Sequence, residues 1–201
     1  METKLSTHRL EAIFLRDKNL VEDVIGKMSF TDAMFYHIVG TPPTCGQTAV
    51  LDAVLVTLME HGLTPSAIST RLTYLSAPEA IQSAIAAGLL NVGSQFIGTM
   101  ENTATLLAKI QSDPAGVEAS CQQIAQQHKD AGKNMPGFGH HLHRPDDPRS
   151  PKLFAIAKAH EDIDQSPIKA INALGAAVDE IYGKHLTINA TGATAAVLMG
   201  A

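Results

Sequence analysis

Residues 135–149 hold the densest group of chemically capable side chains in this sequence. The segment reads Met-Pro-Gly-Phe-Gly-His-His-Leu-His-Arg-Pro-Asp-Asp-Pro-Arg, with three histidines, two aspartates and two arginines. A Gly-Phe-Gly-His turn can present the imidazole of His140 and neighbouring backbone N–H groups to a carbonyl or carboxylate oxygen. Arg149 offers a planar guanidinium that can bind a carboxylate through two hydrogen bonds. These residue types predict chemistry on a carboxylated substrate.

Two other interpretations of this segment remain open. It could be a solvated surface loop, although its paired glycines and the nine-residue spacing of His140 and Arg149 favour a functional turn. It could also bind a metal through His140, His141 and His143. Structural zinc requires three or four converging ligands, and no second cluster is evident in the sequence, so we predict no metal.

His61 is the second candidate for chemistry. It follows an apolar helical pattern over residues 47–60 and precedes Gly62, which predicts a position at a helix C-terminus. The helix dipole favours a protonated imidazole there, and that imidazole could donate to a carboxylate or carbonyl oxygen. The alternative is a capping histidine that satisfies the last helix carbonyls.

Composition limits the class of protein. A chain of 201 residues with 45% hydrophobic and 17% charged residues can form one ordered globular core. The net charge of -5 gives no support to a nucleic-acid partner. We expect no membrane span or secretion signal, because the N-terminus has no apolar segment and no apolar run is long enough. Cys45 and Cys121 match no metal spacing, which predicts free thiols and a cytoplasmic location.

The pattern of caps and prolines predicts an all-α fold, with residues 10–16 as its one possible strand. Ser29 and Asp32 predict the start of a helix that Gly40 ends, and Ser166-Pro167 predicts one that ends at Gly183. Further helix starts are predicted at Ser76-Ala-Pro-Glu79, Asp113-Pro114 and Ser150-Pro151. The apolar tail from Ala190 stops at Ala201 without a cap, so we expect the working protein to continue beyond it.

Five segments occur in an order that points to a known family: residues 60–71 and 86–98, then Pro136-Gly-Phe-Gly-His140, Asp147-Pro-Arg149 and Leu186-Thr-Ile-Asn-Ala-Thr-Gly-Ala193. They resemble citrate synthases, and more closely the citryl-CoA lyase branch, which includes the C-terminal module of ATP-citrate lyase. The last is similar to the Leu-Asn-Val-Asp-Gly-Ala signature of that branch. The resemblance implies a single helical domain over 1–201 that works as a homodimer. Its large lobe would take about 1–112 and 184–201, and its small lobe about 113–183.

The resemblance also assigns roles to individual residues. It implies that His61 contacts a keto acid, that His140 polarises its carbonyl and that Arg149 holds a carboxylate. The backbone of Pro136, Gly137, Phe138 and Gly139 would lie against the adenine of CoA. Phe96 stands where citrate synthases carry a histidine, as it does in the citryl-CoA-cleaving branch. Thr191 is aligned with the catalytic aspartate, with Asn189 beside it, and a threonine cannot serve as a carboxylate base.

These assignments lead to one expected function and two alternatives. We expect reversible carbon–carbon cleavage of citryl-CoA, or a related 3-hydroxy-3-carboxyacyl-CoA, to acetyl-CoA and oxaloacetate. The CoA thioester would be a substrate, and no cofactor would be permanently bound. The alternatives are condensation of an acyl-CoA with a 2-keto acid, and a catalytically silent acyl-CoA-binding protein, which Thr191 favours.

Overall fold

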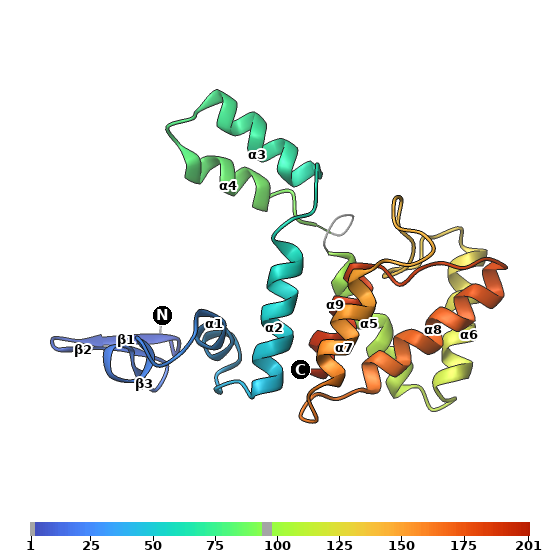
Figure 1. Cartoon of the computed structure of the whole chain (residues 1–201), viewed down its shortest axis with the longest axis horizontal. Coiled ribbons are helices and arrows are strands. Elements are labelled where there is room, and N and C mark those ends of the chain that lie inside the picture. The colour runs from blue at the N-terminus through green and yellow to red at the C-terminus, as the bar shows by residue number, and fades with distance from the viewer. Residues whose placement is uncertain (1–2, 94–97) are drawn as a thin grey trace.

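The computed structural model describes residues 3–93 and 98–201, so Phe96 lies outside the described residues. A small antiparallel sheet at the N-terminus, ordered β1-β2-β3, is followed by helices (Figure 1). The all-α prediction is confirmed, and the predicted strand is β2 (Ala12–Leu15). Two further strands, β1 (Ser6–Arg9) and β3 (Lys18–Asn19), are not predicted from the sequence. The first is polar and exposed and the second has two residues, so neither carries an apolar alternation.

The first two α-helices are fixed by capping boxes. A π-helical turn, Leu20–Val24, leads to α1 (Phe30–Val39), where Ser29 and Asp32 cap each other as predicted. Gly40 ends α1 with a φ of 100°, a conformation that favours glycine. The predicted helix over 47–60 is α2 (Cys45–Leu58), which begins two residues earlier because Thr44 and Gln47 form its capping box.

The next two helices form a hairpin that stands away from the rest of the chain (Figure 1). They are α3 (Pro65–Ser76) and α4 (Ile81–Leu89). The predicted capping box at Ser76 is wrong, because Ser76 is the last residue of α3. Pro78 disfavours a helical conformation at Ala77, whose φ is -142°, so the proline ends one helix instead of opening the next.

The remaining helices form the main core around α9 (Ala190–Gly200). Helices α5 (Thr99–Ser112), α7 (Arg149–Lys158) and α8 (Ser166–Tyr182) all pack against α9, and α6 (Val117–Asp130) packs against α8. The buried face of α9 is rich in small residues such as Ala193 and Ala196, which allow this close approach.

Of the other three proline-based starts, at Asp113, Ser150 and Ser166, only that at Ser166 begins its helix as predicted, with Gly183 at the end of α8. Helix α6 begins after Gly116, and α7 begins at Arg149. Cys45 is exposed, Cys121 is buried, and both are free thiols. Among the described residues, no helix combines the length and the apolar character needed to cross a bilayer.

Candidate functional site

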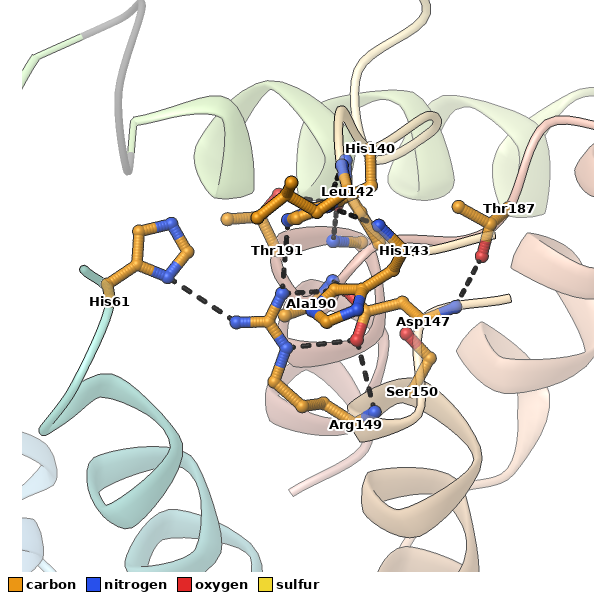
Figure 2. A network of polar contacts seen from close by, with 12 residues as sticks. His61, His140, Leu142, His143, Asp147, Arg149, Ser150, Thr187, Ala190 and Thr191 are labelled. Carbon is orange, nitrogen blue, oxygen red and sulfur yellow. Dashed lines mark hydrogen bonds and ion pairs between the residues drawn. The ribbon is translucent and has the colours of Figure 1, made fainter. Parts of the chain in front are cut away.

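Arg149, the first residue of α7, is held rigidly by a buried carboxylate (Figure 2). Its Nε and Nη2 atoms donate to the two oxygens of Asp147 over 2.9 and 2.8 Å. Its backbone N–H also donates to Asp147, over 3.1 Å. This two-point pairing fixes the plane of the guanidinium and leaves Nη1 and one face for a ligand.

Asp147 is fully buried and is fixed in turn by the backbone around α9. Its backbone N–H donates to Thr187 Oγ1 over 2.8 Å, and its Oδ2 accepts from the N–H of Ala190 over 3.0 Å. Burial acts to raise the pKa of Asp147, but the hydrogen bonds and charge of Arg149 outweigh it and leave the pKa below its ordinary value. The sequence analysis gave Asp147 no role, although the Asp-Pro-Arg motif was the available signal.

The glycine turn before His140 is set against α5 and α9. Gly137 and Gly139 have φ values of 84° and 80°, which side chains other than glycine rarely adopt. A Cβ on Gly192 would lie 2.5 Å from the carbonyl oxygen of Gly137, so glycines are needed on both sides of this contact. The turn is joined to the segment before α9 by Gly139 N–H donating to Thr187 O over 2.8 Å.

The four residues predicted to contact CoA differ in their surroundings. Gly139 lines two cavities, whereas Phe138 is buried in the main core. Gly137 is buried and Pro136 is half-buried. The side chain of Phe138 therefore anchors the turn in the core, and the predicted contact of this backbone with CoA stays a prediction.

His140 is oriented by its own turn. The backbone N–H groups of Leu142 and His143 lie 3.1 and 3.0 Å from its Nδ1, which makes that nitrogen the acceptor. In the neutral ring the proton then sits on Nε2. Nε2 lies 3.4 Å from Nη2 of Arg149. Both nitrogens then carry N–H groups, which cannot bond to each other, so together they can bind one acceptor oxygen placed beside them.

Two further histidines stack on the ring of His140. The ring centroids of His141 and His143 lie 4.8 and 4.4 Å from it. Burial lowers the pKa of His140 below its ordinary value, and the charges of His143, His141 and Arg149 lower it further, against the opposing effect of Asp147. A neutral ring that donates through Nε2 can polarise a carbonyl without first giving up its proton.

His61 also lies beside Arg149, and it comes from the exposed connection between α2 and α3. It lies three residues beyond Leu58, the last residue of α2, so the predicted position at the helix C-terminus is wrong. Its Nδ1 lies 3.4 Å from Nη1 of Arg149. Figure 2 shows His61 and His140 on either side of the guanidinium, so the structure brings these three predicted residues together.

Two cavities meet at His61 and Arg149. The larger, of about 800 Å³, is lined by both of them, by His140 and by Glu60, and is called the cleft below. The smaller, of about 120 Å³, is called the annex. Its remaining walls are Thr57, Leu58, Met100, Ala190, Thr191 and Thr194.

Asn189 and Thr191 lie at the start of α9. Asn189 is the N-cap, and its Oδ1 accepts from Gly192 N–H over 3.0 Å and from the hydroxyl of Thr191 over 2.6 Å. Its Nδ2 donates to Gly139 O over 3.0 Å. Thr191 lines the annex, whereas the amide of Asn189 ties α9 to the glycine turn.

His140, His143 and Asp147 have one potential metal-ligating atom each within 4.8 Å of one another. The potential ligand atoms of two of them are already engaged, since His140 Nδ1 accepts two N–H groups and both oxygens of Asp147 accept from Arg149 or Ala190. A guanidinium 3.4 Å from His140 Nε2 would also repel a cation. The arrangement favours an anionic or carbonyl oxygen over a metal ion.

Comparison with solved structures identifies relatives of this fold. Citryl-CoA lyase from Hydrogenobacter thermophilus matches with 27% identity and a TM-score of 0.87, over 100% of this chain and 76% of that one. ATP citrate lyase from Methanothrix soehngenii, solved with citrate and coenzyme A, matches with 18% identity and a TM-score of 0.86. The alignment covers 100% of this chain and 32% of that one.

A mutant ATP citrate lyase from Methanosaeta concilii, solved with (3S)-citryl-CoA, matches with 18% identity and a TM-score of 0.84, over 100% of this chain and 32% of that one. A search among curated proteins found no match. The family model for the C-terminal domain of citrate synthase matches residues 7–200. The predicted resemblance is thereby confirmed, and the chain belongs to the citrate synthase family.

Proposed function

We propose that this protein is a citryl-CoA lyase-like enzyme that reversibly cleaves citryl-CoA, or a related 3-hydroxy-3-carboxyacyl-CoA, to acetyl-CoA and oxaloacetate. The observation that carries the proposal is the pair of donors, His140 Nε2 and Arg149 Nη2, which face each other over 3.4 Å at the edge of the cleft. The likeness to citryl-CoA lyase at 27% identity supports the same reaction class.

In the cleavage direction, a base takes the proton of the substrate hydroxyl and the carbon–carbon bond breaks. The oxygen becomes the keto-acid carbonyl, and the bonding electrons move into the thioester as an enolate, which takes up a proton to give acetyl-CoA. Charge on the oxygen is greatest before the bond breaks. His140 and Arg149 would stabilise that charge, and removing one such donor typically costs on the order of 10²–10³ in rate. His61 would bind a carboxylate of the keto acid.

The base remains the open part of the proposal. The alignment given above places the catalytic aspartate at Thr191, whereas counting the Leu-Asn-Val-Asp-Gly-Ala signature from Leu186 places it at Asn189, so both positions are candidates for that place. Neither side chain is a carboxylate. Glu60 is the one carboxylate among the residues that line the cleft, and its Oε1 accepts from Gly62 N–H over 2.7 Å.

The direct test is to incubate the full-length protein with citryl-CoA and follow the release of acetyl-CoA. Turnover should exceed that of the His140→Ala variant by on the order of 10²-fold or more. Turnover no greater than that of the variant would remove the lyase proposal. Comparing this rate with condensation of oxaloacetate and acetyl-CoA establishes which direction the enzyme favours.

A silent acyl-CoA-binding protein is the second candidate, because the start of α9 offers an amide and a hydroxyl in place of a base. Asn189→Asp keeps a good N-cap and supplies a carboxylate. If the reaction is limited by a missing base, this variant should gain on the order of 10²-fold in turnover. Thr191→Asp is the matched control, and a gain there alone would assign that place to Thr191.

We also propose a homodimer, working in the cytoplasm. The hairpin and the end of α2 expose large apolar side chains, among them Leu72, Leu75, Ile81, Leu89 and Met59. An exposed apolar area of this kind marks an interaction surface, and a second copy of the chain is the occupant that the family resemblance implies. Sedimentation of the full-length protein should give twice the monomer mass, and a monomer at micromolar concentration would contradict the dimer.

A further inference from the structure

The annex is a partly enclosed pocket beside His61 and Arg149, and the proposed cleavage of citryl-CoA places no group of the substrate in it. It shares His61 and Arg149 with the cleft, so a ligand bound by these two side chains lies at the border of the annex. Its volume of about 120 Å³ corresponds to roughly four water molecules in the liquid. An acetyl methyl group or a hydrogen would leave most of it unfilled.

The walls of the annex present mainly carbon. Leu58, Met100 and Ala190 are apolar, and the hydroxyls of two wall threonines are bonded to protein oxygens. Thr57 donates to Ala53 O over 2.7 Å, and Thr191 donates to Asn189 Oδ1 over 2.6 Å. Polar groups that are satisfied internally gain little from a polar ligand, so such a pocket favours hydrocarbon.

The annex is also built from three separate elements: α2, the start of α5 and the first turn of α9. The wall residue Thr191 in α9 is tied to the first residue of α5, since the hydroxyl of Thr99 donates to that of Thr191 over 3.3 Å. Helices α5 and α9 pack directly together. The pocket is therefore preformed, and a ligand would not have to open it.

Resting on the proposed function, we infer that the annex binds a short alkyl substituent of two to four carbons on the substrate, next to the carbon–carbon bond that forms or breaks. The substituent could belong to the acyl-CoA fragment or to the keto-acid fragment, because both join at that bond. The preferred substrate is then an acid larger than citryl-CoA by this alkyl group.

Binding measured by calorimetry separates the two fragments without requiring turnover. One arm titrates the full-length protein with acetyl-, propionyl-, butyryl- and pentanoyl-CoA. The other uses glyoxylate, pyruvate, 2-oxobutanoate and 2-oxopentanoate, which share the carboxylate and carbonyl. In the arm whose ligands carry the alkyl group into the annex, the affinity should rise by about fourfold for each buried methylene group until the annex is full.

Variants test whether the annex causes this rise. Thr57→Leu adds bulk to the wall and loses only a bond to its own helix, so the dependence of affinity on chain length should flatten. Thr105→Leu is the matched control, because exposed Thr105 makes the equivalent bond to Glu101 O over 3.0 Å, on α5. That variant should keep the full dependence.

The outcomes distinguish the inference from the proposed function. An affinity that is flat or falls with chain length in both arms overturns the inference and leaves citryl-CoA cleavage standing. A rise with chain length but no turnover of any thioester supports the annex and removes the lyase proposal. Absence of binding in both arms overturns both. A rise that survives in Thr57→Leu places the alkyl group elsewhere and also overturns the inference.

Discussion

The two sides of the cleft hold their functional side chains in opposite ways. On the α7–α9 side, Arg149 makes three hydrogen bonds to the buried Asp147. Asp147 is itself bonded to the hydroxyl of Thr187, before α9, and to the backbone N–H of Ala190, the first residue of α9. On the α2–α3 side, His61 lies on an exposed connection and approaches Arg149 only over 3.4 Å. The side chain of Arg149 is therefore fixed before a ligand binds, whereas the position of His61 depends on the ends of α2 and α3.

This difference predicts which side of the cleft contributes more to the affinity for a carboxylic acid. A guanidinium whose geometry is already fixed loses little freedom when a ligand binds, so its interactions contribute nearly in full. A side chain on an exposed connection must be ordered by the ligand, which offsets part of its contribution. Substitutions on the two sides should therefore differ in size and in kind.

The largest effect is expected from removal of the fixed guanidinium. Arg149→Lys keeps the charge but loses the two-point pairing with Asp147 and the donor beside His140. We expect kcat/KM for citryl-CoA to fall on the order of 10²–10³-fold. Arg9→Lys, in the N-terminal sheet, is the control and should retain activity. Equal losses in both variants would mean that Arg149 has no special role.

Breaking the support beneath Arg149 should mainly reduce stability. Asp147→Asn leaves the guanidinium of Arg149, whose side chain is 25% exposed, without its counter-charge. Breaking a fully buried ion pair costs about 3–5 kcal/mol, so we expect a smaller loss, of about 2 kcal/mol, in the free energy of unfolding in urea at pH 7. Ser150→Ala is the comparison with a smaller expected loss of stability, because it removes only one hydrogen bond, to Ile188 O. A loss below that of Ser150→Ala would contradict the account.

The same pair predicts a pH dependence. Because the pKa of Asp147 is lower in the folded protein, the unfolded chain binds more protons in acid. The contribution of the pair is complete above the pKa of an unfolded aspartate, about 3.9, and is lost as pH falls through the folded value. The stability difference between wild type and Asp147→Asn should therefore persist at neutral pH and shrink in acid.

On the α2–α3 side, His61→Ala should have a smaller effect, of about tenfold. Since His61 is proposed to bind a carboxylate in both ground and transition states, the loss should appear mainly in KM and leave kcat little changed. Steady-state kinetics with citryl-CoA make the distinction. A fall in kcat as large as that of Arg149→Lys would show that the two sides contribute equally.

The smallest effect is expected from the histidine stacked on His140. His143→Phe keeps an aromatic ring but removes a group whose charge lowers the pKa of His140. The pKa should then rise toward its ordinary value near 6.5, so neutral His140 is lost at a higher pH. The acidic limb of the pH–kcat/KM profile should therefore move to higher pH. His8→Phe, on exposed β1, should leave the limb in place.

The sequence allowed part of this account to be predicted. His140 and Arg149 were identified because their types and spacing lie in one short segment with a constrained turn. Asp147 was overlooked as a support, since burial and the N–H of Ala190, 43 residues away, depend on tertiary packing. The hairpin was misread at Ser76 because proline both ends and begins helices, and only the path of the chain decides between them. The annex could not be predicted, because its walls come from α2, α5 and α9.

The central claim is that His140 and Arg149 bind the same oxygen of the ligand, the one that is the carbonyl oxygen in the keto acid. A double-mutant cycle with His140→Ala and Arg149→Lys, measured as the affinity for oxaloacetate by calorimetry, tests it most directly. If the oxygen is shared, the double variant should lose little more affinity than the weaker single variant. Losses that simply add would contradict the claim, because they would mean that the two side chains bind separate groups.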